Sequence, residues 1–508
     1  MKTNSLDFDA QALREKILDL AMRGKLVKQD PNDEPASVLL EKIKAEKAKL
    51  VKEGKIKKNK PLPEITADEK PFDIPDSWEW VRLGDIFSIN DRNKATDDMI
   101  VGFLPMKNIK DGYENSFTIE EKSWGKVRKG YTHIQVGDIA LSKITPCFQN
   151  RKSCIITDLP NNIGAATTEI YALYPLIRTF SSLYIYFLKS KMFIEEGTKN
   201  FTGNVGQQRV PKKFVENFVI PLPPLSEQSR IAAKIAQLFA LLRKVESSTQ
   251  QYAKLQTLLK SKVLDLAMRG KLVEQDPNDE PASVLLEKIK AEKEQLIKEK
   301  KIKKSKPLPP ISDEEKTFEI PDSWEWVRLG DVTNFVGTGM VIPANKQFDT
   351  FTSQMLPYFK MNNIGNWDGE FGVNNWTYVL KTQNSDNYLL KSGQLLFNTR
   401  NSRELVGKTT IVPDNLNKKI LANNNILRIE SFGKMKLKYI NYYLISPFSR
   451  HMFLNMTAAT TNVAAIYQKQ LNKLLVPLPP LEEQKRIVKK IDQLFILLKR
   501  DKNYKKVK

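Results

Sequence analysis

One ten-residue stretch occurs twice in this sequence: LDLAMRGKLV stands at residues 18–27 and again at residues 264–273. The match extends without a gap, so that residues 16–86 align with residues 262–332 and 57 of the 71 positions are identical. The units of a solenoid are shorter than this, and they follow one another directly. The sequence therefore predicts two large modules built on a duplicated frame.

A second pair of matching segments shows where each module ends. Residues 221–243 (PLPPLSEQSRIAAKIAQLFALLR) match residues 477–499 (PLPPLEEQKRIVKKIDQLFILLK) at 16 of 23 positions. Between the matching segments lie two blocks that do not resemble each other, roughly residues 87–220 and 333–476. A constant frame around unlike blocks indicates that the two halves share a scaffold and docking surfaces but differ in what they recognise.

The charge balance favours a polyanionic partner. The chain of 508 residues carries 81 Lys and Arg against 59 Asp and Glu, a net charge of +22. DNA and RNA are the commonest partners of so basic a protein, and a soluble basic protein without such a partner is the plain alternative. Nine lysines fall within residues 42–60 and nine within 288–306. Such runs are usually solvated helix faces and are weak evidence by themselves.

The sequence offers no sign of export or membrane insertion. It has no apolar run long enough to cross a bilayer, and its first residues lack the apolar region of a secretory signal. Cys147 and Cys154 are compatible with ordinary thiols in a reducing compartment. We therefore expect a cytoplasmic protein with roughly two to four domains and no membrane partner.

A long helix is predicted in the frame, directly after the PLPPL segment. Apolar residues recur there in steps of four and three, with polar Thr249 and Gln256 interrupting the series. The series is Ile231, Ile235, Leu238, Leu242, Val245, Tyr252, Leu259, Val263 and Leu266. Such a heptad stripe over about 40 residues predicts a helix of roughly 60 Å that packs along a partner helix. We expect Ser226 to cap its start and Gly270 its end.

The chain termini repeat the two halves of this helix. The C-terminal segment matches the first half with Ile487, Ile491, Leu494 and Leu498, and the N-terminal segment matches the second half with Leu13, Ile17 and Leu20. We therefore expect the N- and C-terminal helices to lie near each other and to pack against the central helix. The alternative is that each helix packs on its own module.

The rest of the frame predicts a second helix and the start of each module. Pro35 and Pro281 suit the first position of a shorter helix in the two copies. After a basic, proline-containing linker, the alternating run DSWEWVRLGD predicts a strand with buried tryptophans. Within the blocks, strand-like runs such as residues 169–173 and 426–430 mix with helical stretches, so each module is predicted to be α+β.

The motifs of common catalytic sites are absent from the sequence. There is no G-x-x-x-x-G-K-[ST] phosphate loop and no Asn-Pro-Pro-aromatic tetrapeptide of the methyltransferase type. His133 and His451 fall in different modules and give little material for a zinc site or a catalytic triad. We therefore expect no catalytic residue, no metal site and no cofactor in this chain.

The frame motifs resemble those of a known family. LPPLSEQSRIAAKIAQLFALL with its second copy, LDLAMRGKLV with the QDPNDEPASVLLEKI that follows, and IPDSWEWVRLGD are similar to the specificity subunits of type I restriction–modification enzymes. The likeness covers nearly the whole chain. About 70 residues precede the first module here, whereas some members of the family begin almost directly with it, and neither module can be matched to a known target.

This resemblance implies an α+β fold with two globular α/β target-recognition domains, separated by long antiparallel coiled-coil helices and arranged with pseudo-twofold symmetry. On this basis we expect five segments along the chain. They are the N-terminal scaffold helices (1–60), the first target-recognition domain (61–224), the central coiled-coil helix with the second scaffold helix (225–305), the second target-recognition domain (306–480) and the C-terminal scaffold helix (481–508).

The resemblance also implies a function in which this chain has no catalytic role. Such a subunit binds a bipartite, asymmetric double-stranded DNA target and directs adenine methylation or ATP-dependent cleavage by its partners. The expected partners are two modification subunits and the restriction subunits, which would use S-adenosylmethionine, ATP and magnesium. One alternative is a DNA-binding regulator that acts by itself, and a weaker one is a nuclease or methyltransferase.

DNA contacts are expected from polar and basic side chains on loops of the unlike blocks, because these side chains pair with base edges and phosphates. In the first module the candidates are Lys143, Gln149, Asn150, Arg151, Lys152, Thr202, Asn204, Gln207, Gln208, Arg209 and Lys212. In the second they are Arg400, Asn401, Ser402, Arg403, Lys408, Thr461, Asn462, Gln468 and Lys469. Gly203 and Gly206 are expected to let the backbone approach a phosphate closely.

Overall fold

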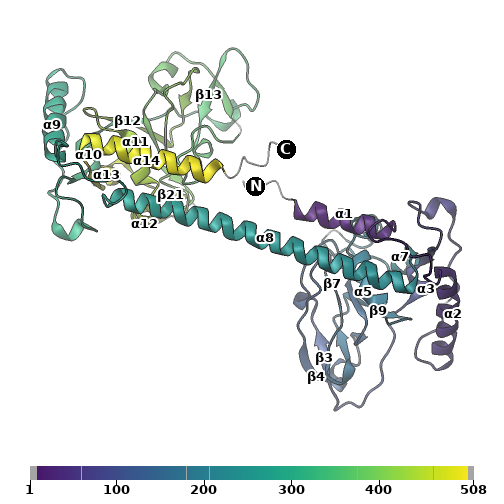
Figure 1. The fold of residues 1–508 in the computed structure, drawn as a ribbon. Helices are drawn as coiled ribbons and strands as arrows, with labels where there is room; N and C mark the ends of the chain where they lie inside the picture. The colour runs from purple at the N-terminus through teal and green to yellow at the C-terminus, as the bar shows by residue number, and fades with distance from the viewer. Residues whose placement is uncertain are drawn as a thin grey trace. The chain divides into compact units, whose positions relative to one another are not determined.

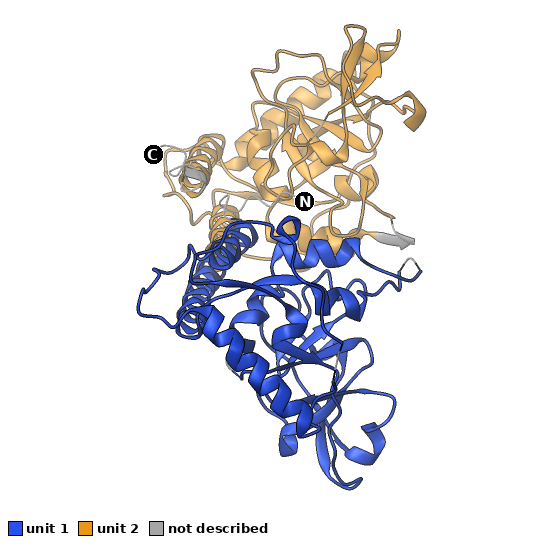
Figure 2. Cartoon of the chain, turned by 90° about the vertical axis from the view of Figure 1, so that its right-hand side faces the viewer, with its two compact units in different colours: residues 1–250 blue, residues 251–508 orange. Residues whose placement is uncertain are grey.

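The structure is a computed structural model that describes residues 9–58, 60–178, 180–204, 206–374, 376–460 and 463–500. It contains two compact units, residues 1–250 and 251–508 (Figure 2). The boundary falls inside the long helix α8 (Leu225–Met268), so each unit combines one unlike block with helices of the frame (Figure 1). Among the described residues, no helix is both long and apolar enough to span a bilayer.

Unit 1 mixes helices and short strands, as the sequence predicts for the first module. The helices are α1 (Ala10–Met22), α2 (Ala36–Lys52), α3 (Leu83–Ile86), α4 (Trp124–Val127), α5 (Phe180–Phe187), α6 (Lys191–Lys199), α7 (Lys212–Asn217) and the first half of α8. The strands are β1 (Glu79–Arg82), β2 (Phe87–Ile89), β3 (Ile100–Leu104), β4 (Glu120–Ser123), β5 (Thr132–Gln135), β6 (Ile139–Ser142), β7 (Ser153–Ile155), β8 (Ile163–Ala166), β9 (Ile170–Pro175) and β10 (Val219–Leu222). They form the sheets β1-β10, β2-β9-β6-β7 and β4-β3-β8-β5.

Unit 2 has a similar order of elements. Its helices are the second half of α8, α9 (Ala282–Lys298), α10 (Leu329–Val332), α11 (Leu437–Leu444), α12 (Pro447–Met456), α13 (Gln468–Asn472) and α14 (Leu481–Arg500). Its strands are β11 (Glu325–Arg328), β12 (Thr333–Thr338), β13 (Met355–Phe359), β14 (Thr377–Leu380), β15 (Leu395–Asn398), β16 (Arg400–Asn401), β17 (Thr409–Ile411), β18 (Leu421–Ala422), β19 (Ile426–Ser431), β20 (Ala458–Thr460), β21 (Val463–Ala465) and β22 (Leu475–Leu478). The sheets are β11-β22, β12-β19-β15-β17, β14-β13-β18 and β16-β21-β20.

In each unit the frame closes on itself through a two-stranded sheet. The predicted strand in DSWEWVRLGD is confirmed as β1, which pairs antiparallel with β10 so that Glu79 lies opposite Leu222. Its second copy, β11, pairs with β22 in the same register, with Glu325 opposite Leu478. The two segments that match between the halves are therefore bound to each other within each unit. The unlike block is the part of the chain between these two paired segments.

A buried hydrogen bond reinforces this closure beside each two-stranded sheet. The Trp78 indole N–H donates to the Glu227 carboxylate of α8 at 2.8 Å, and Trp324 donates to Glu483 of α14 at the same distance. Gln29 donates to the second oxygen of Glu227 at 2.6 Å. Burial raises the pKa of the Glu227 carboxyl, since the charged form loses its water.

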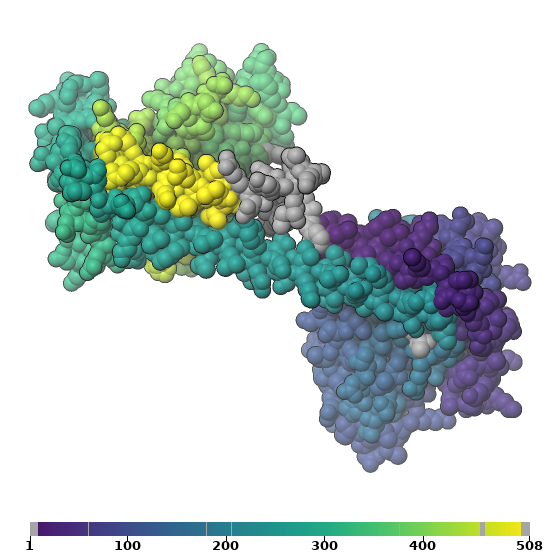
Figure 3. Space-filling model, viewed as in Figure 1, coloured from purple at the N-terminus to yellow at the C-terminus, as the bar shows by residue number. Residues whose placement is uncertain are grey.

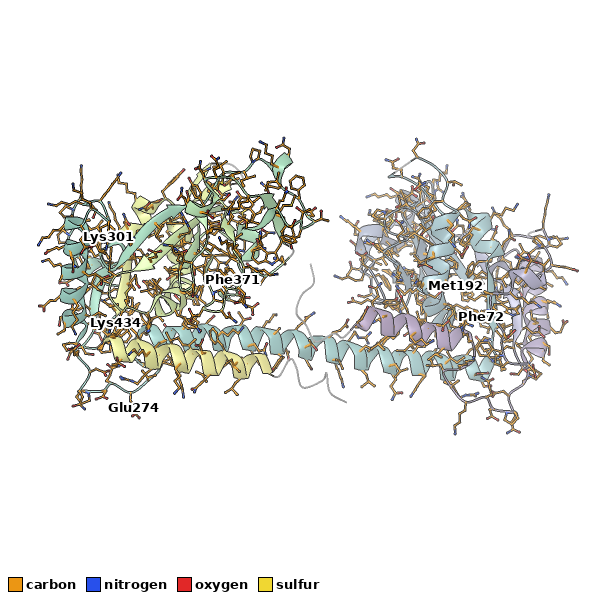
Figure 4. The ribbon with its side chains drawn as sticks, turned by 90° about the horizontal axis from the view of Figure 1, so that it is seen from above. Phe72, Met192, Glu274, Lys301, Phe371 and Lys434 are labelled. Atoms are coloured by element: carbon orange, nitrogen blue, oxygen red, sulfur yellow. The ribbon has the colours of Figure 1, made fainter. Side chains whose placement is uncertain are left out.

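Frame and module share one hydrophobic core in each unit. In unit 1, Leu18 of α1 and Ile235 of α8 belong to the same buried cluster as Phe187 of the module. In unit 2, Leu264 of α8 and Ile487 of α14 are buried together with apolar residues of α11. Phe72, labelled in Figure 4, packs against the buried cluster of unit 1, and the centre of its ring lies 5.1 Å from the centre of the Trp80 ring. The frame helices are thus part of the globular units.

Each terminal helix packs along one half of α8. In unit 1, α1 lies along the first half of α8 (Figure 4). There the guanidinium of Arg14 donates two hydrogen bonds, of 2.9 and 2.5 Å, to the Glu246 carboxylate. In unit 2, α14 lies along the second half of α8 (Figure 3). There the Gln256 side chain donates to the carbonyl of Leu498 on α14 at 2.9 Å. The predicted contacts with the central helix are confirmed within each unit. That α1 and α14 lie near each other stays a prediction.

The predicted apolar seam of α8 is wrong in its middle. Ile231 and Ile235 are fully buried, but Val245, Tyr252 and Leu259 are 44%, 38% and 52% exposed. A heptad seam stays buried only where a partner helix runs beside it without interruption. Burial along α8 instead follows its contacts with the two globular cores, which reach its ends.

The predicted starts of two kinds of helix need correction. Helix α8 begins at Leu225, so Ser226 lies inside its first turn, where its hydroxyl donates to the Asp33 carboxylate at 2.5 Å. Pro35 and Pro281 precede α2 and α9 by one residue and are their N-caps, because their ψ angles of 154° and 156° are extended. The preferences of serine for the N-cap and of proline for the first helical position therefore predicted these helix starts to within one residue.

The glycines of the repeated decamer end their helices as predicted. Gly24 follows α1 and Gly270 follows α8, with φ angles of +67° and +66°. The backbone N–H of the next residue then donates to the carbonyl of Leu20 or Leu266, at 2.8 Å in both copies. This is the 6→1 bond of a Schellman motif, for which a left-handed residue is required. The decamer is therefore a helix end of the scaffold.

We expect Glu227→Ala to loosen the closure of unit 1 and to leave unit 2 unchanged. The substitution leaves the buried indole N–H of Trp78 without an acceptor, which costs about 1–3 kcal/mol. Hydrogen exchange followed by mass spectrometry measures this as faster exchange in peptides from β1 and the segment before α2. The matching peptides of unit 2 serve as the internal reference.

The control is Glu287→Ala, which removes an exposed carboxylate from α9. It should leave exchange in both units at the level of the unsubstituted chain. Unchanged exchange around β1 in the Glu227 variant would mean that the buried hydrogen bond does not hold the frame closed.

Candidate nucleic-acid interface

Three loop segments of unit 1 meet at one edge of the sheet β2-β9-β6-β7. We call loop cluster 1 the described residues of 143–152, 167–169 and 202–209. Strands β6 and β9 are antiparallel neighbours, so the end of β6 and the start of β9 reach the same edge. The Lys143 N–H donates to the Glu169 carbonyl at 3.0 Å, and the Val210 N–H donates to the Lys143 carbonyl at 2.8 Å. The two stretches predicted from sequence therefore lie side by side.

The third segment of this cluster is a narrow hairpin. Thr202 and Arg209 pair antiparallel, with backbone hydrogen bonds of 2.9 and 2.8 Å. Gly203 and Gly206 have φ angles of +104° and +86°, a region that L side chains rarely adopt. Asn204, next to Gly203, is exposed. The hairpin thus presents backbone and a small amide at its tip, which suits close approach to a phosphate or a base edge.

An ion pair organises the charges of loop cluster 1. The Arg209 guanidinium binds both oxygens of the Glu169 carboxylate at 2.8 Å, and its side chain remains 41% exposed. Arg209 lowers the pKa of Glu169. The Lys143 ammonium lies 4.9 Å from the centre of the Tyr171 ring, and burial lowers its pKa. Both cations therefore have fixed positions at the surface of the cluster.

Arg151 is not placed as a reader of bases. Its Nε donates to the Lys189 carbonyl at 3.0 Å, and its guanidinium forms an ion pair of 3.0 Å with Glu15 of α1. The same guanidinium lies 5.1 Å from the centre of the Tyr113 ring. These contacts use the side chain to join the loop to the scaffold, so we remove Arg151 from the candidate DNA contacts.

The remaining candidates of unit 1 differ in exposure. Gln149, Asn150, Thr202, Asn204 and Gln207 are exposed, and Gln208 is half-buried. Lys152 lies 3.5 Å from Asp111, and Lys212, at the start of α7, lies 3.0 Å from Glu216. The exposed amides have the donors and acceptors that base edges require. The two lysines are each partly neutralised by a carboxylate.

Unit 2 places three corresponding segments together. We call loop cluster 2 the described residues of 399–408, 423–425 and 458–465. Arg400 lies opposite Ala465 in a short antiparallel pair, and the Thr399 N–H donates to the Asn425 carbonyl at 2.9 Å. Each of these positions stands 256 residues after its counterpart in loop cluster 1. The backbone framework is therefore repeated although the side chains are not.

The candidates of unit 2 divide into exposed, half-buried and buried groups. Arg400, Arg403, Gln468 and Lys469 are exposed, Asn401 and Ser402 are half-buried, and Thr461 and Asn462 lie outside the described residues. Lys408 is 5% exposed, and its ammonium donates to the Ile364 carbonyl at 2.8 Å. A buried lysine bound to backbone cannot meet a phosphate, so we also remove Lys408 from the candidate contacts.

The turns that form the middle of both clusters are candidates that the sequence patterns did not single out. Residues 167–169 (TTE) connect β8 to β9, and residues 423–425 (NNN) connect β18 to β19. The first loop segment of each cluster follows the strand that pairs with β9 or β19, which is β6 or β15. Asn423 is buried and donates to the Tyr358 hydroxyl at 2.7 Å, whereas Asn424 is half-buried and Thr168 is exposed. The three consecutive asparagines before the predicted strand at 426–430 were the signal, since such runs mark turns.

The described part of the chain offers no site for a metal ion. No three His, Cys, Asp or Glu side chains among the described residues are grouped so that they could hold one. His133 is buried, where its Nδ1 accepts the Asn93 N–H at 3.0 Å and its Nε2 lies 2.9 Å from the Arg128 carbonyl. Burial lowers its pKa, so the neutral ring serves to join loops.

Comparison with known proteins places the two units in one family. The family described as "Type I restriction modification DNA specificity domain" matches residues 75–256 and again residues 321–507. The chain belongs to this DNA specificity family. Each match starts just before the β1 or β11 strand of the frame and runs through one complete unlike block.

Two relatives from Escherichia coli extend the match to almost the full chain. The specificity subunit of type I restriction enzyme EcoAI is 41% identical over 96% of this chain and 89% of its own length. The corresponding EcoEI subunit is 37% identical over the same shares. Among solved structures, a chain from a study of assembly and conformational transition of the type I R-M system has a TM-score of 0.56 at 21% identity. It covers 85% of this chain and 94% of its own. That likeness shows the fold.

We expect Arg403→Ala to weaken DNA binding and to reduce its dependence on salt. Arg403 is exposed in loop cluster 2, and loss of one phosphate contact reduces the slope of log K against log salt by about 1. Titrations of a target duplex at several salt concentrations measure both quantities. Lys391→Ala is the control, because this exposed lysine lies at the other end of β15. An unchanged slope for Arg403→Ala would exclude that residue from the interface.

Proposed function

We propose that this chain is the DNA-recognition subunit of a type I restriction–modification complex. The observation that carries the proposal is the combination of two frames with the same closing contacts and two loop clusters with different side chains. The frames share the Trp–Glu hydrogen bond and the register of the two-stranded sheet. In this proposal the frames serve identical partners, and the loop clusters read different DNA sequences.

The two clusters support a target with two unlike halves. Loop cluster 1 offers the exposed amides of Gln149, Asn204 and Gln207, whereas loop cluster 2 offers the exposed guanidinium groups of Arg400 and Arg403. Amides favour adenine and guanidinium groups favour guanine or phosphate. A chain with both clusters therefore reads a bipartite and asymmetric target. The net charge of +22 supplies attraction for the phosphates.

Exposed leucines of the frame support two equivalent docking surfaces for partners. Leu241 on α8 and its counterpart Leu497 on α14 are 51% and 58% exposed. Leu13 on α1 and its counterpart Leu259 on α8 are 43% and 52% exposed. Contiguous exposed apolar patches mark interaction surfaces, and in this proposal the exposed leucines at matching positions contribute to two such surfaces. We assign these surfaces to two modification subunits, one for each unit.

The spacer and the chemistry complete the proposal. In it, α8 forms an antiparallel coiled coil with α1 and α14 that separates two target-recognition domains, residues 61–224 and 306–480, with pseudo-twofold symmetry. Adenine methylation and ATP-dependent cleavage belong to the modification and restriction subunits. S-adenosylmethionine, ATP and magnesium are bound by those subunits, and this chain contributes recognition.

Mapping of modified bases tests the proposal. Genomic DNA from cells that contain this chain with its modification subunits should carry methylated adenine in one split, asymmetric motif. Deletion of this chain should abolish methylation of that motif, because the modification subunits then lack recognition. The purified complex should contain two modification subunits for each copy of this chain, measured by native mass spectrometry.

The control is a complex whose modification subunits carry a mutation that abolishes methylation. It should still bind the DNA target, although the motif stays unmethylated. Methylation that persists after deletion of this chain would contradict the proposal. A chain that binds its target and regulates transcription without any modification subunit would instead support a regulator that acts by itself.

A further inference from the structure

A lysine is completely buried at the end of α5 in unit 1. Lys189 is 0% exposed, and its ammonium donates to three backbone carbonyls, those of Gly112, Glu114 and Arg151, at 2.8, 3.1 and 2.9 Å. All three donors of the ammonium are therefore used. Burial without a hydrogen-bonded carboxylate lowers the pKa of Lys189 to about 7. Burial of so polar a side chain is costly, which calls for a role other than filling the core.

The second unit shows that the core does not need a lysine at this position. The residue 256 positions later, Ile445, is 3% exposed and fills the same place in the chain order after α11. Both α5 and α11 are followed by a serine N-cap, Ser190 and Ser446, so the local backbone is the same. Lys189 is thus a feature of the first module.

Unit 2 has its own buried lysine at a different position. Lys408 ends the first segment of loop cluster 2 and donates to the Ile364 carbonyl at 2.8 Å. Burial lowers its pKa. Its counterpart in unit 1 is Lys152, which instead lies 3.5 Å from Asp111. The two buried lysines therefore come from unrelated positions of the two blocks.

The two lysines bind equivalent connecting segments of their own units. In unit 1 this segment follows the short helix η2 (Met106–Asn108), and in unit 2 it follows η6 (Met361–Asn363). Its start is marked in both by an isolated bridge, Ile109 with Phe117 and Ile364 with Phe371. Lys189 joins this segment to the Arg151 carbonyl in loop cluster 1, and Lys408 belongs to loop cluster 2 itself. Two different side chains thus make the same connection.

We propose that Lys189 and Lys408 are positioning residues for DNA recognition, each holding the first loop segment of its cluster on the segment after η2 or η6. The inference rests on the proposed function, since it assigns the loop clusters to DNA. In unit 1 the Gly112 N–H also donates to the Asn150 carbonyl at 2.8 Å. The exposed candidates Gln149 and Asn150 are therefore attached to the segment around Gly112, whose backbone Lys189 holds in place.

The test maps methylated motifs in cells that contain the full complex with Lys189→Met or Lys408→Met. Methionine keeps the length and apolar stem of lysine and removes its donors. We expect each variant to loosen one half of the split motif, a different half for each lysine, while the other half stays as specific as before. The loosened half should lose about tenfold in discrimination against single mismatches, the effect of one lost base contact.

Lys191→Met is the matched control, because this lysine lies two residues from Lys189 and is exposed. It should leave both halves of the motif unchanged. Lys189→Gln, which keeps a donor but no charge, accompanies Lys189→Met in case the latter does not accumulate. A merely structural lysine would lower methylation at all sites without changing the motif.

An unaltered motif in the soluble Lys189 and Lys408 variants would overturn the inference and leave the proposed function standing. Equal loosening of both halves by one variant would also overturn it, as would failure of every buried-lysine variant to accumulate as folded protein. If the unsubstituted chain directs no split motif, the proposed function itself fails.

Discussion

Each unit of this protein depends on the buried hydrogen bond that joins a tryptophan of the frame to a glutamate at the start of a long helix. The two partners are 149 residues apart in unit 1 and 159 in unit 2. The bond and the two-stranded sheet beside it bring together the segments at both ends of the unlike block. Because the closure uses only the last residues of the block, those that open β10 and β22, the rest of the block can change in sequence and length while the frame keeps its shape. The repeated sequence is the scaffold that makes this possible.

The sequence predicted those features that local patterns determine. The long helix, the strand in DSWEWVRLGD and the helix-ending glycine of the decamer follow from heptad steps, alternation and left-handed backbone. The seam of α8 was wrong at Val245 and Leu259, which are exposed, because a heptad pattern alone does not determine how much of each apolar side chain a partner helix covers. The offset of 256 residues relates the two loop clusters, but only the fold shows that three loops meet in each.

The candidate site was harder to predict, because loop composition does not reveal burial. Arg151 and Lys408 have the chemistry of DNA contacts, yet one holds α1 through Glu15 and the other binds the backbone at Ile364. A cation in a loop can serve the phosphates of a ligand or the carbonyls of its own chain with equal ease. Exposure separates the two roles, and it leaves the amides of cluster 1 and the arginines of cluster 2 as the strongest candidates.

The central claim is that the frame carries no sequence preference and that each block carries its own. The most direct measurement is the methylation motif directed by a chain in which residues 87–220 replace residues 333–476, so that both frames hold the first block. We expect a split motif whose two halves are the same half-site in inverted orientation. An asymmetric motif that retains the original second half would contradict it, because the frame or the rest of unit 2 would then determine that half.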